Sequence, residues 1–341
     1  MDVPKEILRV IENHNKFVIS THISPDGDAI GAQLGLYSFL KELGKQVWVI
    51  NADPVPYGYA FLPFSDIISS KLPPESFEIL IVVDAGSLMR IGDELSKVLL
   101  PEKSIINIDH HVTNDKFGHY NWVDADACAA SELIYKLIKR HGMNIGQKRA
   151  ICLYTGIMTD TGCFRFSNTT PETHRIVAEL IAEGVSAEEI SRFVYENLPS
   201  SRIKLLGLVL STLQVSLDEK IAWIRVTQNM YASTSTNKED TENFIDYVKF
   251  IDTVEIALFF VELKSGKTKV SFRSKNEFDV SKIAVKFGGG GHQRAAGCTI
   301  EASVDETEKT VVANIQKELT SFNMRKSKVE GSPRTIWGAG V

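Results

Sequence analysis

The sequence predicts an α/β protein in which an N-terminal, doubly wound, mostly parallel sheet is followed by a smaller C-terminal α/β domain. In the first half, short apolar runs typical of strands alternate with amphipathic helical segments, as in sheets built from β-α-β units. In the second half, strands and helices follow a different order. A chain of 341 residues is also longer than one domain usually is, so two domains are expected.

The first domain, residues 1–190, is expected to contain the parallel sheet and to bind metal. Its strands are predicted at residues 16–21, 46–50, 78–83 and 104–108. The last two are continuous apolar runs, which is the pattern of strands buried on both faces. Helical periodicity predicts helices at residues 29–43, 129–140, 147–158 and 171–183, and Gly44 is a typical C-terminal residue for the first of them.

The second half is expected to begin with a helical linker, residues 191–213, whose pattern is interrupted near Pro199. Residues 214–323 are predicted to form a substrate-binding domain. Its expected strands are at 221–226, 254–263 and 268–273, and its expected helices at 241–251 and 304–320. Residues 324–341 contain several Lys, Arg and Gly residues and one Pro, and are predicted to be a disordered tail.

The composition excludes several classes of protein. Hydrophobic residues make up 43% and charged residues 24%, which is ordinary for a soluble globular protein. The net charge of −5 provides no basic surface for long duplex nucleic acid. No apolar run approaches the roughly 20 residues that span a bilayer, and the N-terminus does not resemble a secretory signal. The four scattered cysteines argue against disulfides or a thiolate zinc site, so we expect a cytoplasmic protein.

Acidic and histidine side chains follow the apolar segments of the first domain. A His-x-x-x-Asp-x-Asp pattern follows the first strand, one aspartate closes the third, an Asp-His-His triplet follows the fourth, and a further aspartate is expected to follow another β-like segment. These residues are His22, Asp26, Asp28, Asp84, Asp109, His110, His111 and Asp160. Because parallel strands end at one edge of a sheet, where open α/β sheets bind ligands, we expect these side chains to converge.

Such a set of oxygen and nitrogen ligands suits two divalent cations, an arrangement for attack on phosphorus. The expected ligands are His22 and Asp26 for one ion, Asp28, His110 and Asp160 for the other, and Asp84 for both. Carboxylate and imidazole ligation without thiolate favours Mn²⁺, with Mg²⁺ or Co²⁺ as substitutes. We expect Asp109 to orient a histidine and His111 to act near the leaving group. Taken alone, an aspartate at a strand end such as Asp84 could instead be a helix N-cap, Asp160 could cap a turn, and the histidine pair could be surface or core residues.

Four consecutive glycines precede His292 and form the second motif. The backbone N–H groups of Gly289, Gly290 and Gly291 are expected to form an anion-binding nest, with a helical turn after them. His292 can donate to a phosphate or a base. Arg273 and Ser274 end the strand at 268–273, and the Arg273 guanidinium offers a bidentate fork to phosphate. The alternative is a flexible hinge.

These motifs resemble those of the DHH phosphoesterase superfamily, over residues 5–322. The glycine run with His292 looks like the signature of the substrate-binding domain in its exonuclease branch. The resemblance implies two Mn²⁺ ions and a hydroxide between them that attacks phosphorus. The implied ligands are His22, Asp26 and Asp84 for one ion and Asp28, Asp84, His110 and Asp160 for the other. The implied phosphate-binding residues are Arg273, Ser274, His292 and Gly289–Gly291.

The compact two-domain form is similar to the nanoRNase branch, whose members degrade very short oligoribonucleotides to mononucleotides and remove the 3′-phosphate of pAp. A stand-alone phosphodiesterase for cyclic di-AMP or its linear product pApA is a close alternative. An inactive nucleotide-binding regulator is an alternative from another class, and it predicts the loss of a metal ligand. A terminal base is expected to stack on Phe164 or Phe166, and the apolar segment 203–213 suggests a homodimer.

Overall fold

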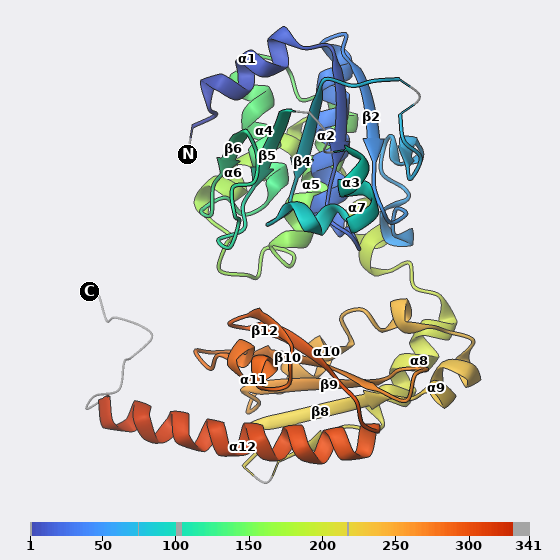
Figure 1. The fold of residues 1–341 in the computed structure, drawn as a ribbon, viewed down its shortest axis with the longest axis vertical. Coiled ribbons are helices and arrows are strands. Elements are labelled where there is room, and N and C mark those ends of the chain that lie inside the picture. Colours follow the sequence, from blue (N-terminus) through green and yellow to red (C-terminus); the bar gives the residue numbers. More distant parts are fainter. Residues whose placement is uncertain (1, 74, 100–103, 217, 330–341) are drawn as a thin grey trace. The chain divides into compact units, whose positions relative to one another are not determined.

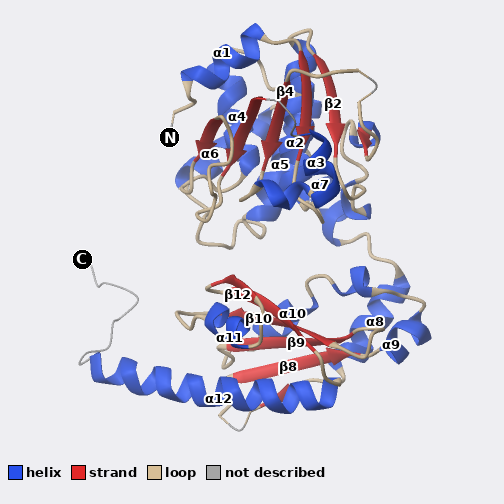
Figure 2. Cartoon of the chain, viewed as in Figure 1, coloured by secondary structure: helices blue, strands red, loops and turns tan. Residues whose placement is uncertain are grey.

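The computed structural model describes residues 2–73, 75–99, 104–216 and 218–329. The described residues divide into two compact units, the first ending at Asn197 and the second beginning at Leu198 (Figure 1). Each unit contains one six-stranded sheet with helices packed on it (Figure 2). The first sheet is parallel throughout and the second is mixed, so the predicted α/β class is confirmed.

The sheet of the first unit has the strand order β3-β2-β1-β4-β5-β6. Its strands are β1 (Lys16–Ser20), β2 (Gln46–Ile50), β3 (Ile68–Ser69), β4 (Ile79–Val83), β5 (Ser104–Asp109) and β6 (Tyr120–Val123). The short strands β3 and β6 at its edges were not predicted. The order reverses between β1 and β4, which pair side by side. In an open parallel sheet, this switch point forms a crevice at the carboxyl ends of the strands.

The helices of the first unit cover both faces of its sheet. They are α1 (Lys5–Asn13), α2 (Gly27–Glu42), α3 (Asp93–Leu99), α4 (Ala130–Arg140), α5 (Gln147–Asp160), α6 (Pro171–Ala182) and α7 (Ala187–Tyr195). Phe17 and Ile81 belong to a large core with α2, α4 and α5, whereas Val18 and Leu80 belong to a smaller core on the side of α3. Because successive strand residues face opposite cores, these strands consist of continuous apolar runs.

Helix α2 crosses α5 at very short range, and three glycines spaced four residues apart make this approach possible. They are Gly27, Gly31 and Gly35. A methyl group at Gly31 would lie 2.4 Å from the carbonyl oxygen of Cys152 on α5. The two helices run in opposite directions, because Gly27 faces Thr159 and Gly35 faces Leu153. The N-terminus of α2 therefore lies beside the C-terminus of α5.

The second unit has the strand order β11-β12-β10-β9-β8-β7, in which only β8 and β9 pair in parallel. Its strands are β7 (Gln214–Val215), β8 (Ile221–Val226), β9 (Ile256–Glu262), β10 (Thr268–Ser274), β11 (Gly290–His292) and β12 (Ala295–Ile300). Its helices are α8 (Ser200–Leu210), α9 (Gln228–Thr234), α10 (Phe244–Lys249), α11 (Val280–Lys286) and α12 (Val304–Val329). Helices α11 and α12 pack on one face and α8, α9 and α10 on the other. Among the helices described, none is long and apolar enough to cross a membrane.

Two segments differ from the prediction. Helix α8 lies within the predicted linker, but Leu205 and Val209 are fully buried in a core of the second unit, because their spacing of four places both on one helix face.

Helix α12 continues through residues 324–329, which were predicted to be disordered. Its Lys and Arg residues are good helix formers, and the first glycine after Met324 is Gly331. The rest of the predicted tail, residues 330–341, lies outside the described residues.

Candidate active site

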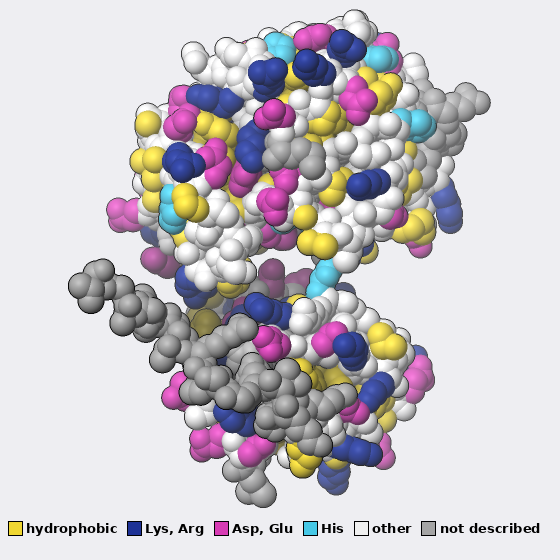
Figure 3. All heavy atoms as spheres, turned by 90° about the vertical axis from the view of Figure 1, so that its left-hand side faces the viewer, with side chains coloured by type: hydrophobic (Ala, Val, Ile, Leu, Met, Phe, Trp, Pro, Cys, Tyr) yellow, Lys and Arg dark blue, Asp and Glu magenta, His cyan; other side chains and the backbone are white. Residues whose placement is uncertain are grey.

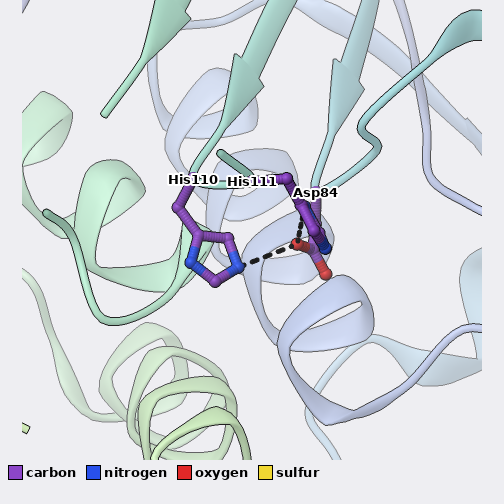
Figure 4. A group of neighbouring side chains, drawn as sticks. All are labelled: Asp84, His110 and His111. Atoms are coloured by element: carbon purple, nitrogen blue, oxygen red, sulfur yellow. Dashed lines mark ion pairs between the residues drawn. The ribbon is translucent and has the colours of Figure 1, made fainter. Parts of the chain in front are cut away.

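The side chains that follow β1, β4 and β5 converge at the carboxyl edge of the parallel sheet, with Asp84 at their centre. His22 Nε2 lies 3.6 Å from Asp84 Oδ2, and His110 Nε2 lies 3.4 Å from Asp84 Oδ1. Figure 4 shows His110 and His111, from the end of β5, directed toward Asp84. His110 Nε2 is also 3.9 Å from Asp28 Oδ2 and 3.6 Å from Asp160 Oδ2. His110 Nε2 therefore lies within 4 Å of carboxylates from three different segments of the chain.

Three overlapping groups bring potential metal-ligand atoms within 4.8 Å of one another. They are His22, Asp26 and Asp84; Asp28, His110 and Asp160; and Asp84, His110 and His111. The first group has the composition of one predicted ligand set, and the second has that of the other set without Asp84, which instead joins His110 in the third group. The third adds His111, which was expected to act in chemistry only. The binding of metal to these groups stays a prediction.

The environment of Asp84 fits a divalent cation. Asp84 is 2% exposed, and its Oδ1 accepts no hydrogen bond of normal geometry from the described residues. An ionised carboxylate oxygen that is buried without a donor is costly, and a cation supplies the missing partner. Asp84 also has a φ of 55°, a left-handed conformation that is uncommon outside glycine. The oxygen and imidazole donors around it suit Mn²⁺ chemistry.

Both histidines beside Asp84 are oriented by backbone carbonyls. His22 Nδ1 donates to the Ile23 carbonyl at 2.8 Å, and His110 Nδ1 donates to the Ala127 carbonyl at 3.3 Å. In each ring Nδ1 carries a proton, so Nε2 is the atom directed at the carboxylates; it is protonated without metal and would be the lone-pair donor to a bound cation. Histidines that bind metals commonly have this second hydrogen bond, which sets the tautomer and the direction of the ring.

Asp26 and Asp28 have structural as well as potential metal-binding contacts. Asp26 Oδ1 caps α2 by accepting from the N–H groups of Asp28 and Ala29, both at 3.0 Å. Asp28 is fully buried and accepts from the N–H groups of Ala130 at 2.5 Å and Ser131 at 2.9 Å. Those N–H groups form the positive N-terminus of α4, which stabilises a carboxylate. Neither the helix-capping role of Asp26 nor the contact of Asp28 with α4 was predicted.

Asp109 orients His111. Its Oδ1 accepts from His111 Nδ1 at 2.7 Å, and its Oδ2 accepts from Asn114 Nδ2 at 2.6 Å. Asn114 also donates to the Ala85 carbonyl at 3.1 Å, so it links the loops after β4 and β5. The hydrogen bond from His111 to Asp109 raises the pKa of the His111 imidazole. Asn114 was not predicted, although its position in the loop after the Asp-His-His triplet is a possible signal.

The charges of this cluster shift one another's ionisation. Burial and neighbouring carboxylates raise the pKa values of Asp26 and Asp28, and raise that of Asp160 to about 7. Burial opposes the charge on His22 and His110, but Asp84 outweighs it and raises their pKa values to about 9 and about 11. Burial likewise opposes ionisation of Asp84, yet the two histidines hold its pKa below the usual range. Without metal, protons neutralise the cluster.

Addition of Mn²⁺ to the metal-free protein is expected to raise the melting temperature of the first unit. A ligand at 100 times its Kd stabilises by about 2.7 kcal/mol, which corresponds to roughly 5–10 °C for a unit of this size. Metal ligands must be deprotonated, so the shift should grow between pH 6 and pH 8. Differential scanning calorimetry with and without Mn²⁺ measures it, with Ca²⁺ for comparison. An equal shift with Ca²⁺ would contradict an imidazole-containing site, because Ca²⁺ prefers oxygen ligands.

Asp160 reaches the site from a helix, which corrects the expectation that it follows a strand. It is the last residue of α5, whose C-terminus lies beside the N-terminus of α2 at the carboxyl edge of the sheet. The apolar residues before Asp160 resemble a strand because both sides of α5 are buried. Tertiary packing of α5 on α2, and not strand pairing, brings Asp160 to His110.

In the second unit, the predicted phosphate-binding residues separate onto two faces. His292 pairs with Ala295 on β12, and Ala295 pairs with Arg273 on β10, so His292 and Arg273 lie in one row on one face of the sheet. The small Ala295 side chain leaves space between them. Ser274, the next residue of β10, is 5% exposed and faces the opposite side. Because successive strand residues point to opposite faces, the Ser274 side chain does not share the face of Arg273 and His292, and its contact with the phosphate stays a prediction.

The glycine run forms an edge strand instead of a nest followed by a helical turn. Residues Gly290–His292 are β11, which pairs with β12, and the helix α11 lies before the run. A methyl group at Gly289 would lie 2.1 Å from the Gly297 carbonyl oxygen, and one at Gly291 would lie 2.5 Å from Ala296 Cα. Close approach to β12 therefore requires these glycines. An edge strand still presents alternate N–H groups outward, where an anion can accept from them.

The fold and the site together define a metal-dependent phosphoesterase, with a carboxylate and imidazole centre on a parallel α/β unit and a second α/β unit after it. Residues 16–157 match the DHH family, N-terminal domain, and residues 222–322 match the DHHA1 domain. The chain belongs to the DHH family, and the predicted resemblance is confirmed.

Similar proteins extend over almost the whole chain. The bifunctional oligoribonuclease and PAP phosphatase NrnA of Thermus thermophilus is 36% identical, over 94% of this chain and 94% of its own length. The protein of the same name from Bacillus subtilis is 30% identical, over 91% of this chain and 97% of its own length. The crystal structure of an exopolyphosphatase-related protein from Bacteroides fragilis superposes with a TM-score of 0.87 at 32% identity, covering 93% of this chain and 96% of that one.

Proposed function

We propose that this protein is a Mn²⁺-dependent phosphodiesterase that degrades very short oligoribonucleotides to mononucleotides and removes the 3′-phosphate of pAp. The convergence of His22, His110 and several carboxylates on the buried Asp84 carries the proposal. The names of the relatives from Thermus thermophilus and Bacillus subtilis support it, because both are oligoribonucleases and PAP phosphatases similar to this chain along most of its length.

The first two of the groups described above would hold two Mn²⁺ ions, with Asp84 shared between them. The proposed ligands are His22, Asp26 and Asp84 for one ion and Asp28, Asp84, His110 and Asp160 for the other. When bound, such a pair of ions lowers the pKa of water and neutralises charge on the phosphate. Backbone carbonyls orient the two histidines by accepting from their Nδ1 atoms, and N–H groups at the N-terminus of α4 hold the Asp28 carboxylate.

His111 and Asp109 are the proposed catalytic pair. As a water oxygen bonds to phosphorus, the bond from phosphorus to the leaving nucleoside oxygen breaks, and that oxygen needs a proton. His111 Nδ1 is occupied by Asp109 at 2.7 Å, so Nε2 is the atom available to donate. Asp109 raises the pKa of His111 and thereby favours the protonated ring. Asn114 holds Asp109 from its other oxygen and keeps the pair rigid.

The face of the second sheet that carries Arg273 and His292 is the proposed site for a terminal phosphate. Its floor is made of small residues, because Gly290, Gly297 and Ser271 form the next row beside Ala295. The two polar side chains flank this floor and fit one phosphate and its sugar, not a long backbone. On the surface drawn in Figure 3, basic and acidic side chains are interspersed within each unit, which suits a short substrate.

Replacing Arg273 by alanine is expected to lower kcat/KM by about 10- to 100-fold for substrates with a terminal phosphate, because a charge-assisted hydrogen bond contributes roughly 1.5–3 kcal/mol. Dinucleotides without that phosphate should lose much less. Lys269→Ala, an exposed residue on the same face of β10, is the matched control. Steady-state kinetics on pApA and ApA test this, and an equal loss on both substrates contradicts the role of Arg273.

Product analysis of the purified protein with Mn²⁺ on linear pApA, cyclic di-AMP and pAp tests the function as a whole. We expect fast hydrolysis of pApA and pAp and slow turnover of cyclic di-AMP. Dominant cleavage of cyclic di-AMP would instead assign the protein to second-messenger degradation. Tight nucleotide binding without turnover would assign it to regulation. Protein carrying Asp84→Asn, prepared in the same way, excludes a contaminating nuclease.

Two further features belong to the proposal. We propose a cytoplasmic setting, supported by cysteines that are all free thiols among the described residues. We also propose a homodimer that uses exposed apolar side chains of α8, of which Ile203 is 51% and Leu208 is 39% exposed. Sedimentation equilibrium of the wild type and of Ile203→Asp tests the second proposal, and a monomeric wild type contradicts it.

A further inference from the structure

The loop after β1 contains one peptide group that is hydrogen-bonded at both ends. The carbonyl of this group, which joins Ile23 to Ser24, accepts from His22 Nδ1 at 2.8 Å. Its N–H donates to Asp53 Oδ2 at 2.6 Å. The C=O and N–H of a trans peptide point in opposite directions, so the peptide lies between the Asp53 carboxylate and the His22 ring.

The orientation of this peptide is not one that the backbone would adopt freely. Ser24 has a φ of 52°, which is disfavoured for a residue with a side chain and persists only where surrounding contacts determine it. On one side, the N–H of Ile23 donates to the Arg90 carbonyl at 2.7 Å, in the 3-10 helix Leu88–Ile91. On the other side is Asp53, which comes from the loop after β2, the neighbour of β1.

We propose that Asp53 is a positioning residue that acts through the Ile23–Ser24 peptide to set the tautomer and direction of the His22 ring. The contact from Asp53 is a charge-assisted hydrogen bond, the stronger kind. A carboxylate, a peptide and an imidazole in series also polarise one another. In many metal sites a carboxylate contacts the histidine directly and has the same effect; here one peptide group stands between them. The inference rests on the proposed metal site at His22, Asp26 and Asp84.

Loss of Asp53 is expected to release this peptide. Water replaces the carboxylate at the N–H of Ser24, because Asp53 is only half-buried, but water does not hold the left-handed conformation in place. Rotation of the peptide turns the Ile23 carbonyl away from His22 Nδ1. His22 Nε2 then loses its fixed direction toward Asp84, and the affinity for metal falls by about 10-fold, the lower end of the range for residues behind a ligand.

The test is a titration of metal-free, full-length protein with Mn²⁺, in which electron paramagnetic resonance measures the free ion. Asp53→Ala should weaken one class of sites by about 10-fold, whereas Asp53→Asn, which keeps an oxygen acceptor, should retain most of the affinity. Asp66→Ala, at an exposed aspartate in the 3-10 helix Ser65–Ile67, is the control and should match the wild type. The ¹H–¹⁵N signal of His22 Nδ1–H should weaken or move in Asp53→Ala only.

A double-mutant cycle decides between positioning and a general structural role. In the His22→Ala background, Asp53→Ala should cause no further loss of Mn²⁺ affinity, because Asp53 acts through His22. Additive losses, or an unchanged affinity in Asp53→Ala, would overturn the inference. If Asp53→Ala does not fold, Asp53→Asn provides the test. A full loss of Mn²⁺ affinity in Asp53→Asn, together with an unchanged His22 signal, would also overturn the inference. The measurements use no substrate, so a protein that binds Mn²⁺ through His22 but hydrolyses no nucleotide would contradict the proposed function alone.

Discussion

Asp84→Asn is expected to lower turnover on the order of 1000-fold, the largest effect of any single change in the site. Asp84 lies within 3.7 Å of nitrogen atoms from His22, His110 and His111 and belongs to more than one potential ligand group. Loss of its charge weakens the binding of both proposed ions. Such ions stabilise the charge of the transition state by several kcal/mol. Each 1.36 kcal/mol corresponds to a factor of ten in rate. Activity and Mn²⁺ affinity should therefore fall together.

Asparagine is the informative replacement because of the backbone at this position. The φ of 55° at Asp84 is one that asparagine tolerates, whereas alanine there adds roughly 1–2 kcal/mol of strain. Asp84→Asn should therefore unfold cooperatively, and Asp84→Ala should lose both activity and stability. Asp115→Asn, at an exposed aspartate in the loop after β5, is the control with near-normal kinetics. Near-normal turnover in Asp84→Asn would remove Asp84 from the shared position.

Gly31→Ala is expected to destabilise the first unit by about 1–3 kcal/mol, the usual cost of overpacking a core. The added methyl group would lie 2.4 Å from the Cys152 carbonyl oxygen and 3.1 Å from the Gly156 nitrogen. Both are backbone atoms, so α2 and α5 must move apart. These helices carry Asp28 and Asp160, and their separation should also reduce metal affinity.

Thermal unfolding of two further variants tests this explanation. Gly35→Ala should cost less than Gly31→Ala, because its methyl group meets the end of the flexible Leu153 side chain at 2.6 Å. Gly207→Ala, in α8, places its methyl group in open space and should be neutral or stabilising by up to about 1 kcal/mol, as alanine is the better helix former. A melting temperature of Gly31→Ala equal to that of the wild type would show that the helices can separate without cost.

Much of the first unit follows from local patterns. The segment that became β1 predicted a strand, the apolar runs that became β4 and β5 predicted strands buried on both faces, and Gly44, with a φ of 76°, ends α2 as expected. The parallel order then follows from the alternation of strands with helices. These patterns are local because the alternation of side chains along a strand and the turn of a helix are properties of a few consecutive residues.

Other features depend on contacts between distant segments. Nothing in the sequence near Asp28 indicates that the N-terminus of α4 binds it, and nothing near Asp160 indicates that a helix brings it to the site. The row that joins Arg273 to His292 follows from the register of β10, β12 and β11, and the need for Gly289 follows from the nearness of β12. The link from Asp53 to His22 passes through a peptide whose left-handed conformation no local pattern predicts.

Residue type and short spacing were enough to predict the α/β class, the family resemblance and a set of candidate acidic and histidine ligands. The tertiary structure decided which of those residues meet, and which neighbours orient them. His110 meets Asp160 because three glycines let α2 approach α5, and Asn114, which holds Asp109 behind His111, is fixed to the loop after β4 by its hydrogen bond to the Ala85 carbonyl. The physical reason is that a side-chain contact depends on the packing of whole elements, which is set by the summed interactions of the chain and not by any one segment.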